Sequence, residues 1–234
     1  MKWHLPVLAL LLLALSTASA YAGGACCSVS GTGSESPTLT VVGASAMNHE
    51  IVGGTSYKLE QRALILKVGK PLGNGFILQA QLGMPTGTEL TGQAAELSGR
   101  SGLIYGAGLG YKPPRRLGPF KFFASLSYSR AIASLDRATS QAVDRYFLIS
   151  EFQALLLAEM PLAARTSFYT GPRAYSGKNR LTDRKAGNTV NGDQEGNLGW
   201  VAGARYNLSD KLALIADAGF GHTKVLGLGA VLSF

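Results

Sequence analysis

Cysteine, charge and long apolar runs are all scarce in this sequence, and each shortage excludes a class of protein. Only two cysteines occur among 234 residues, and because Cys26 and Cys27 are adjacent, they cannot staple distant segments into a disulfide-stabilised fold. Charged residues make up 15% of the chain, which suits a protein whose outer surface meets lipid. Beyond the N-terminus no apolar run approaches the roughly 20 residues of a membrane-spanning helix, so a helical membrane protein is excluded as well.

The N-terminus has the organisation of a secretory signal peptide. Lys2 is followed by an apolar run at residues 5–15 and then by small residues up to Ala22. The apolar run is too short to span a bilayer. We therefore expect three parts: a signal peptide at residues 1–22, a flexible lead-in rich in glycine and serine at residues 23–37, and one domain at residues 38–234.

Cys26 and Cys27 fall in this lead-in, and their role stays open. An oxidising periplasm would allow a strained disulfide between them. A lipid anchor on Cys26 would need an aliphatic residue three places earlier, and Gly23 is there instead.

The positive net charge does not indicate a nucleic-acid partner. Lysine and arginine outnumber aspartate and glutamate by 22 to 14, which gives a net charge of +8. A nucleic-acid-binding protein would gather these cations on one element, whereas here they are spread along the chain. The sequence predicts no nucleic-acid partner, no cofactor and no metal site.

The last ten residues, 225–234, have the period of a strand with two unlike faces. Gly227, Gly229 and Ser233 alternate with larger apolar residues, which are Leu226, Leu228, Ala230, Leu232 and Phe234. An exposed terminal phenylalanine gains little unless something apolar covers it, and lipid is the candidate.

Nine earlier segments have a similar strand pattern, so the sequence predicts ten strands. They are residues 39–47, 57–68, 76–84, 102–112, 120–129, 146–160, 162–175, 198–206, 212–220 and 225–234. Connections after the even-numbered strands are short, while the longest of the others are polar loops at residues 85–101, 132–144 and 176–196. Short periplasmic turns and longer external loops are typical of outer-membrane barrels. The predicted fold is therefore all-β, a closed antiparallel up-and-down transmembrane β-barrel of about ten strands, with eight strands as the alternative.

Aromatic and glycine positions agree with a barrel. Five aromatic residues fall at the short-turn end, as an interfacial girdle would: Phe76, Tyr111, Phe120, Tyr206 and Phe234. Every second residue of 102–110 except Ile104 is glycine on the inward face, and Phe123 of the next strand could fill the space that these glycines leave.

We expect a network of charged side chains inside the barrel. Its predicted members are Glu60, Arg62, Glu151, Arg173 and Asp217. An isolated buried charge costs several kcal/mol, so opposite charges should pair. Barrels of about eight strands are filled by side chains and those of 16–18 are open, so ten strands predict a narrow or plugged lumen. The function would then be that of a structural or surface-binding barrel, or of a small-solute pore.

Two surface features suggest further functions. Four cations of the longest predicted loop could pair with lipopolysaccharide phosphates: Lys178, Arg180, Arg184 and Lys185. Closure of the barrel would also bring His49 and Glu50 of the first strand near His222 at the last one. A general base or a metal needs such a cluster, so the alternative function is an outer-membrane hydrolase of lipid or peptide with a rim site there.

The chain ends G-x-x-L-x-F, with Gly229, Leu232 and Phe234, and this ending resembles the C-terminal strand of bacterial outer-membrane β-barrels, which their assembly machinery recognises. From the signal peptide to this strand, the chain resembles small outer-membrane barrels of the OmpA-membrane-domain and OmpX type. Those families have eight strands, against the ten predicted here. The resemblance implies recognition by the assembly machinery. We expect a monomer in the bacterial outer membrane, with outer-membrane lipid, lipopolysaccharide and that machinery as partners.

Overall fold

Eleven antiparallel strands form one sheet in the part of the chain that the computed structural model describes. The described residues are 36–92, 96–114, 118–137, 145–194, 198–221 and 223–234. The strands are β1 (Thr38–Val52), β2 (Thr55–Gly73), β3 (Phe76–Gly92), β4 (Glu96–Tyr111), β5 (Lys121–Arg137), β6 (Arg145–Ala163), β7 (Thr166–Asp183), β8 (Asn188–Gln194), β9 (Leu198–Asn207), β10 (Leu212–Gly221) and β11 (Lys224–Ser233).

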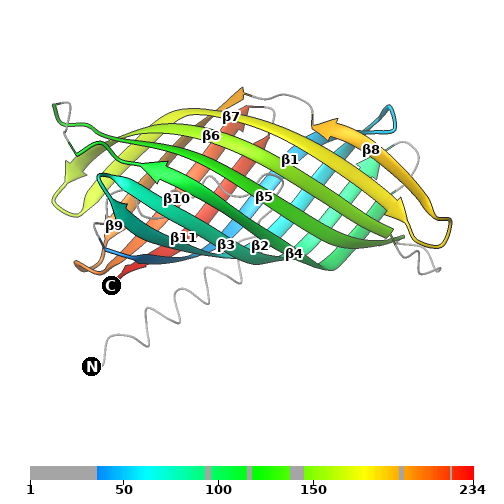
Figure 1. The fold of residues 1–234 in the computed structure, drawn as a ribbon, viewed down its shortest axis with the longest axis horizontal. Helices are drawn as coiled ribbons and strands as arrows, with labels where there is room; N and C mark the ends of the chain where they lie inside the picture. Colours follow the sequence, from blue (N-terminus) through cyan, green and yellow to red (C-terminus); the bar gives the residue numbers. More distant parts are fainter. Residues whose placement is uncertain (1–35, 93–95, 115–117, 138–144, 195–197, 222) are drawn as a thin grey trace.

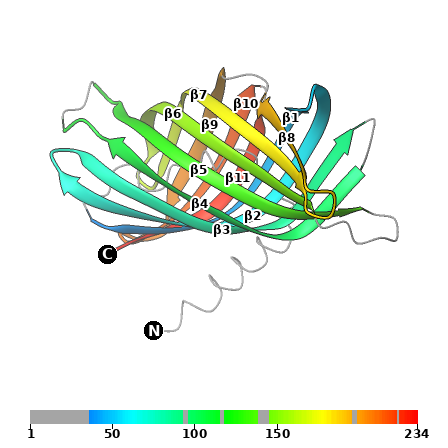
Figure 2. The ribbon, with the colours of Figure 1, turned by 45° about the vertical axis from the view of Figure 1, so that its right-hand side comes forward.

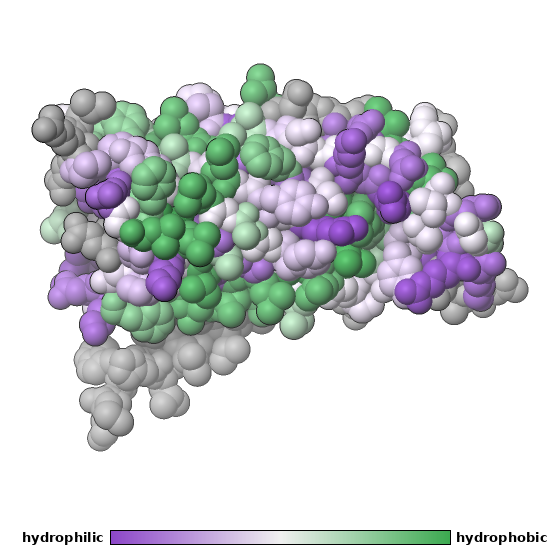
Figure 3. Space-filling model, in the orientation of Figure 1, coloured by the Kyte–Doolittle hydropathy of each residue, from purple (hydrophilic) through white to green (hydrophobic). Residues whose placement is uncertain are grey.

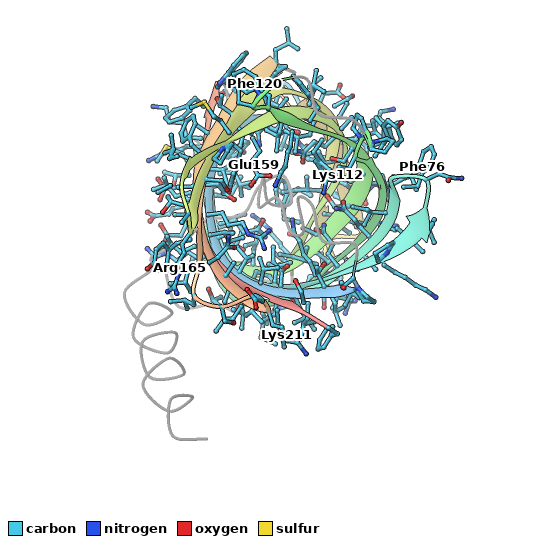
Figure 4. The ribbon with its side chains drawn as sticks, turned by 90° about the vertical axis from the view of Figure 1, so that its left-hand side faces the viewer. Phe76, Lys112, Phe120, Glu159, Arg165 and Lys211 are labelled. Atoms are coloured by element: carbon cyan, nitrogen blue, oxygen red, sulfur yellow. The ribbon has the colours of Figure 1, made fainter. Side chains whose placement is uncertain are left out.

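Ten of these strands close into a ring (Figures 1 and 4). The order is β1 to β7 and then β9 to β11, and β11 pairs back onto β1 from Thr38 opposite Ser233 to Met47 opposite Lys224. Both termini of this ring lie at one end, which we call the C-terminal end (left in Figure 1). The predicted up-and-down barrel of about ten strands is confirmed. Among the described residues, no helix is long and apolar enough to cross a bilayer.

The eleventh strand, β8, changes the strand number at the opposite end, which we call the hairpin end. β8 pairs with the last residues of β7, where Lys178 lies opposite Asp193, and with β1, where Val52 lies opposite Gly192 (Figure 2). The strands β9, β10 and β11 do not extend far enough toward the hairpin end to pair with β8. At the hairpin end the wall is therefore made of eight strands, β1 to β8.

The predicted loops are wrong where strands run through them, at residues 85–92, 96–101, 132–137, 176–183 and 188–194; the rest of the second loop, residues 138–144, lies outside the described residues. Beyond the bilayer a strand is polar on its outward face, so the composition of these segments resembles that of loops. Several of their inward positions are apolar and buried, as Leu90, Leu97 and Leu135 show, while Thr88 and Asn179 are buried polar residues.

The outward face carries an apolar band on the half of the barrel nearer the C-terminal end (Figure 3). On β3 the exposed apolar run begins at Phe76 and ends at Met84. Its nine residues match the 9–11 that a tilted strand needs to cross a bilayer. The strands β2 to β7 have 16–19 residues, so they continue beyond the band toward the hairpin end.

The short turns and aromatic residues lie at the C-terminal end, as predicted. In the turn between β2 and β3, Asn74 has a φ of 52° between two glycines that also have positive φ, so the chain reverses in the region these residues tolerate. All five girdle aromatics are exposed. The rings of Phe76 and Tyr111, one residue opposite the other on β3 and β4, have centroids 4.9 Å apart.

The inside of the barrel is filled largely by apolar side chains. The hairpin-end cluster lies inside the eight-stranded part and consists of Val52, Leu59, Leu90, Leu97, Ala133, Leu135, Phe147 and Ile149, with Tyr57, Ala131 and Leu181 packed against it. Two further clusters lie in the ten-stranded part; one includes Phe123, Leu157 and Tyr169, and the other Ile65, Ile104 and Ile215. Burying one such side chain is worth about 1.5–3 kcal/mol, so this interior contributes much of the fold's stability.

Two inward glycines make room for large rings from neighbouring strands. A Cβ on Gly110 would lie 2.8 Å from the ring of Phe123, so the predicted use of the β4 glycines is confirmed there. Gly203 on β9 lies in the same way against the ring of Tyr169 on β7. A larger residue at either position would force the ring to move.

Candidate functional site

Arg173 on β7 is the centre of the charged groups inside the barrel. It is 2% exposed, and its charge acts on Glu151 of β6 and on Asp217 of β10. Its Nη2 donates a hydrogen bond to the backbone oxygen of Thr223, 3.1 Å away, and its Cζ lies 4.7 Å from the centroid of the Tyr175 ring. The guanidinium of Arg173 thus connects β7 with β6, with β10 and with the turn that leads into β11.

Asp217 joins this centre to the far wall. The hydroxyl of Tyr169 donates to its Oδ2 over 3.5 Å, and Lys67 of β2 supplies a second nearby positive charge. A Cβ on Gly227 of β11 would lie 2.5 Å from its Oδ1, so only glycine leaves room for this carboxylate.

Glu151 joins the centre to β8. It accepts a hydrogen bond from the side chain of Gln194, whose Nε2 also donates to the hydroxyl of Thr223 over 3.3 Å. The backbone nitrogen of Thr223 donates to the hydroxyl of Tyr175, 3.1 Å away. Side chains therefore satisfy the backbone of Thr223 where β8 and β11 do not pair.

We call these four charges and their neutral partners the lumen network. Lys67 and Arg173 balance Glu151 and Asp217, and all four are buried. Each of these charges has an opposite charge nearby, which avoids the cost of an isolated buried ion, although Oδ1 of Asp217 accepts no hydrogen bond among the described residues. The arrangement is suited to fastening strands together, because each charged group faces a partner from the protein itself.

The structure brings three of the predicted network members together inside the barrel, namely Glu151, Arg173 and Asp217, whereas Glu60 and Arg62 do not face the lumen. The inward positions of β2 are odd-numbered, so Glu60 and Arg62 lie on its outward face. They lie beyond the apolar band toward the hairpin end, where charges meet water and not lipid, and Glu60 forms an ion pair with Lys58.

Sequence reasoning missed Lys67. The signal that could have identified it is its odd residue number, because alternate residues of a strand face the same side of the sheet. Lys67 is an odd-numbered residue of β2, so it had to face the lumen once Glu60 and Arg62 faced outward. The mistake came from placing the whole strand inside the bilayer. Only its second half lies in the apolar band, where Leu66 and Val68 are exposed.

Outside the barrel, a basic groove of about 530 Å³ runs across β5 to β8. Its lining consists of Arg130, Leu148, Ser150, Lys178, Asn179, Arg180, Asn191, Gly192 and Asp193. Lys178 and Arg180 were predicted in a loop; they lie on the outward face of β7. Arg130 of β5 was missed, because nothing in the sequence places it beside Lys178.

The other two predicted lipopolysaccharide contacts lie in the β7–β8 hairpin, away from this groove lining. The guanidinium carbon of Arg184 lies 4.0 Å from the centroid of the Tyr146 ring. The backbone nitrogen of Lys185 donates to Oδ1 of Asp183 over 3.0 Å.

Asp183 organises this hairpin, which lies outside the membrane-spanning segments. Its carboxylate accepts from the backbone nitrogens of Ala186 and Lys185, each 3.0 Å away, and from Nε of Arg145, 3.1 Å away. The bond from Ala186, followed by that from Arg145, holds the pKa of Asp183 below its ordinary value.

A cavity of about 710 Å³ opens at the C-terminal end of the barrel. Figure 4 views this end, with Glu159 pointing into the opening and Phe76 and Phe120 on the outside. Glu159 accepts a hydrogen bond of 2.6 Å from the hydroxyl of Ser167. Four cations contribute to the lining, namely Lys121, Arg165, Arg205 and Lys211.

The predicted hydrolase site is not tested by the structure. His222 lies outside the described residues, as do the side chains of His49 and Glu50. Within the described part of the chain, no group of three or more histidine, cysteine, aspartate or glutamate residues could hold a metal ion. The signal peptide, Cys26 and Cys27 also lie outside the described residues.

The residues of the predicted assembly signal lie on both faces of β11. Leu232 and Phe234 are exposed on the outward face, and the backbone nitrogen of Phe234 donates to the oxygen of Pro37 over 3.0 Å. Gly229 faces inward, where a Cβ would lie 2.5 Å from the backbone oxygen of Val41.

Comparison with known proteins agrees with this architecture. No family model matches the sequence, and no curated protein matches it. The structure is similar to the translocator domain of the autotransporter NalP from Neisseria meningitidis, with a TM-score of 0.53, 16% identity and coverage of 99% of this chain and 96% of that one. It is also similar to an outer-membrane channel from Pseudomonas putida F1 (TM-score 0.49, 12% identity, coverage 91% and 100%) and to the attachment invasion locus protein Ail of Yersinia pestis (TM-score 0.43, 15% identity, coverage 86% and 100%). At such low identity these similarities concern the fold alone.

The ring of ten antiparallel strands, its apolar band and its aromatic girdle define a transmembrane β-barrel. The protein is a bacterial outer-membrane β-barrel, surrounded by the lipids of that membrane. The predicted location and the resemblance to small outer-membrane barrels are confirmed.

Proposed function

We propose that this protein is a closed, monomeric barrel that serves as a structural and surface-binding element of the outer membrane, and that it neither conducts solutes nor catalyses a reaction. The hairpin-end cluster carries this proposal. Its eleven side chains come from β1 to β7, that is, from seven of the eight strands around that end. An eight-stranded barrel leaves an interior that side chains can fill, so an apolar core here leaves no continuous aqueous path.

The lumen network supports the same conclusion. Its two cations and two carboxylates face one another, so they do not line an open path with one sign of charge, as a selective pore would. Its hydrogen bonds also fasten β8 to Thr223, the residue just before β11. The ring closes within one chain, which supports a monomer.

The surface-binding part of the proposal is supported by the strands beyond the apolar band. In outer-membrane barrels, short turns face the periplasm and longer segments face outward, so the hairpin end would face the exterior. There β2 to β7 and β8 present a rigid polar surface where binding groups are held by sheet pairing.

Planar-bilayer conductance tests the closed lumen. We expect no steady conductance from the wild-type protein, in the same membranes where a general porin conducts. Glu151→Ala should lower the unfolding midpoint, because Arg173 loses a partner, and yet remain silent, because the hairpin-end cluster still blocks the path. A large steady wild-type conductance would overturn the closed barrel. Current that appears only in Glu151→Ala would show a charge gate in place of the apolar block.

A further inference from the structure

We propose that the basic groove binds the phosphate groups of a phosphorylated glycolipid of the outer leaflet, with Arg130, Lys178 and Arg180 as the cationic contacts. This inference deepens the proposed surface-binding function and rests on it. It replaces the predicted four-residue loop site with a site on the wall of the barrel.

The groove is built on one cross-strand row of residues. Arg130 lies opposite Ser150, Ser150 opposite Lys178, and Lys178 opposite Asp193, from β5 to β8. Neighbouring strands are about 4.8 Å apart, so the backbones of Arg130 and Lys178 are about 10 Å apart with the serine between them. Two long cationic side chains at this separation can reach one phosphate from both sides.

The next row supplies a third cation that is already oriented. Leu148, Arg180 and Asn191 lie opposite one another on β6, β7 and β8. Nε of Arg180 donates to Oδ1 of Asn191 over 3.0 Å, and this bond restricts the orientation of the guanidinium without using its terminal amino groups. A preoriented guanidinium is suited to bidentate binding of phosphate oxygens.

Arg130 adds an unmet hydrogen-bonding requirement. Its Nε is buried and donates to no acceptor among the described residues. Leaving a buried donor unsatisfied is costly, so an anionic oxygen in the groove would gain a charge-assisted bond there.

The charge of the groove matches a phosphate monoester. Three cations and the single carboxylate of Asp193 leave a net charge of +2 in the lining. A phosphate monoester carries about −1.5 to −2 at neutral pH. The hydroxyl of Ser150 and the amide of Asn191 add neutral donors.

The position of the groove indicates a lipid as the source of this phosphate. The next outward residues toward the C-terminal end are Tyr128 on β5 and Phe152 on β6, and both are exposed within the apolar band. Two residues along a strand span about 7 Å. Phosphates in the groove would therefore sit at the headgroup level while the acyl chains of the same molecule contact Tyr128 and Phe152.

Binding of rough lipopolysaccharide to protein refolded from inclusion bodies tests the site. Two double variants each remove two positive charges. Lys178→Gln/Arg180→Gln removes them from the groove on β7, and Arg184→Gln/Lys185→Gln removes them from the hairpin that follows β7. We expect the groove variant to lose about tenfold or more in affinity and the hairpin variant to lose little. Arg130→Gln should also bind about tenfold more weakly. Equal loss in both double variants would overturn the groove in favour of diffuse hairpin charge.

The probe is varied to establish the chemistry. Lipopolysaccharide that has been dephosphorylated should bind about as weakly as the groove variant, and unchanged binding would overturn the phosphate assignment. Inorganic phosphate should bind far more weakly than lipopolysaccharide; equal affinity would overturn the glycolipid source.

Heat-modifiable migration on gels reports folding of each variant. Lys178 and Arg180 are exposed, so their double variant tests the site even where Arg130→Gln does not fold. Failure of glycolipid binding with a silent bilayer would reject this site and leave the closed barrel standing, whereas a conducting barrel that binds normally would do the reverse.

Discussion

Arg173 of β7 donates a hydrogen bond from its Nη2 to the backbone oxygen of Thr223, 3.1 Å away and 50 residues further along the chain. This bond lies at the level where the wall changes from ten strands to eight. Because β8 does not pair with β11, side-chain hydrogen bonds take the place of backbone pairing at this junction. Arg173 is therefore the residue whose loss should most weaken the junction between the two parts of the barrel.

Arg173→Leu should destabilise the folded barrel by about 3–5 kcal/mol, because Glu151 and Asp217 lose the cation they share. Urea unfolding in lipid vesicles, followed by intrinsic fluorescence, measures this change. Arg165→Leu is the matched control, since Arg165 is exposed in the turn that leads into β7, the strand that carries Arg173. Equal losses of stability in the two variants would show that Arg173 does not stabilise the junction between the ten-stranded and eight-stranded parts.

Gly203→Val should lower the unfolding free energy by about 1–3 kcal/mol, because the added atoms would meet the ring of Tyr169 and push it toward Asp217. Ala204→Val adds bulk at the next residue, which faces outward and is exposed, and it should leave stability nearly unchanged. The ratio of folded to unfolded bands after graded heating compares the two. A smaller effect of Gly203→Val than of Ala204→Val would contradict the inward packing of β9.

Phe234→Ala should reduce the amount of folded protein in outer-membrane fractions about as much as deletion of Phe234. The alanine variant keeps the backbone bond to Pro37, so a loss in both variants would point to the ring as the assembly signal. Phe76→Ala removes another exposed aromatic at the same end and should assemble normally. If only the deletion impairs assembly, the terminal backbone pairing matters and the aromatic ring does not.

The β7–β8 hairpin should lose order in acid because of Asp183. Its pKa is lowered in the folded hairpin, mainly by the bond from Ala186, so its contribution is complete above the unfolded pKa of about 4 and is lost as pH falls through the folded value. The amide signals of Lys185 and Ala186 in NMR spectra of micelle-bound protein should shift together over that interval. Asp183→Asn should abolish the titration, and an unchanged titration in that variant would assign it to another group.

The outward faces of β3, β6 and β11 followed from the amino-acid sequence alone, because lipid requires apolar side chains at every second position. Residues such as Leu78, Leu156 and Leu228 are exposed as predicted. The same alternation placed Glu151, Arg173 and Asp217 inside. In these strands the apolar residues follow the two-residue period of a strand, so alternation within one strand was sufficient to assign each side chain to the lipid or the lumen face.

Only the tertiary structure decided which part of each strand lies in the bilayer and which strands are neighbours. A strand wholly embedded in the membrane would place Glu60 and Arg62 in the lumen, but β2 extends well beyond the apolar band, and there both residues face outward. The pairing of Arg130 with Ser150 and of Ser150 with Lys178 depends on the register between three strands. Alternation within a strand carries no information on that register, because sliding a strand by two residues leaves every side chain on its face and gives it a new neighbour.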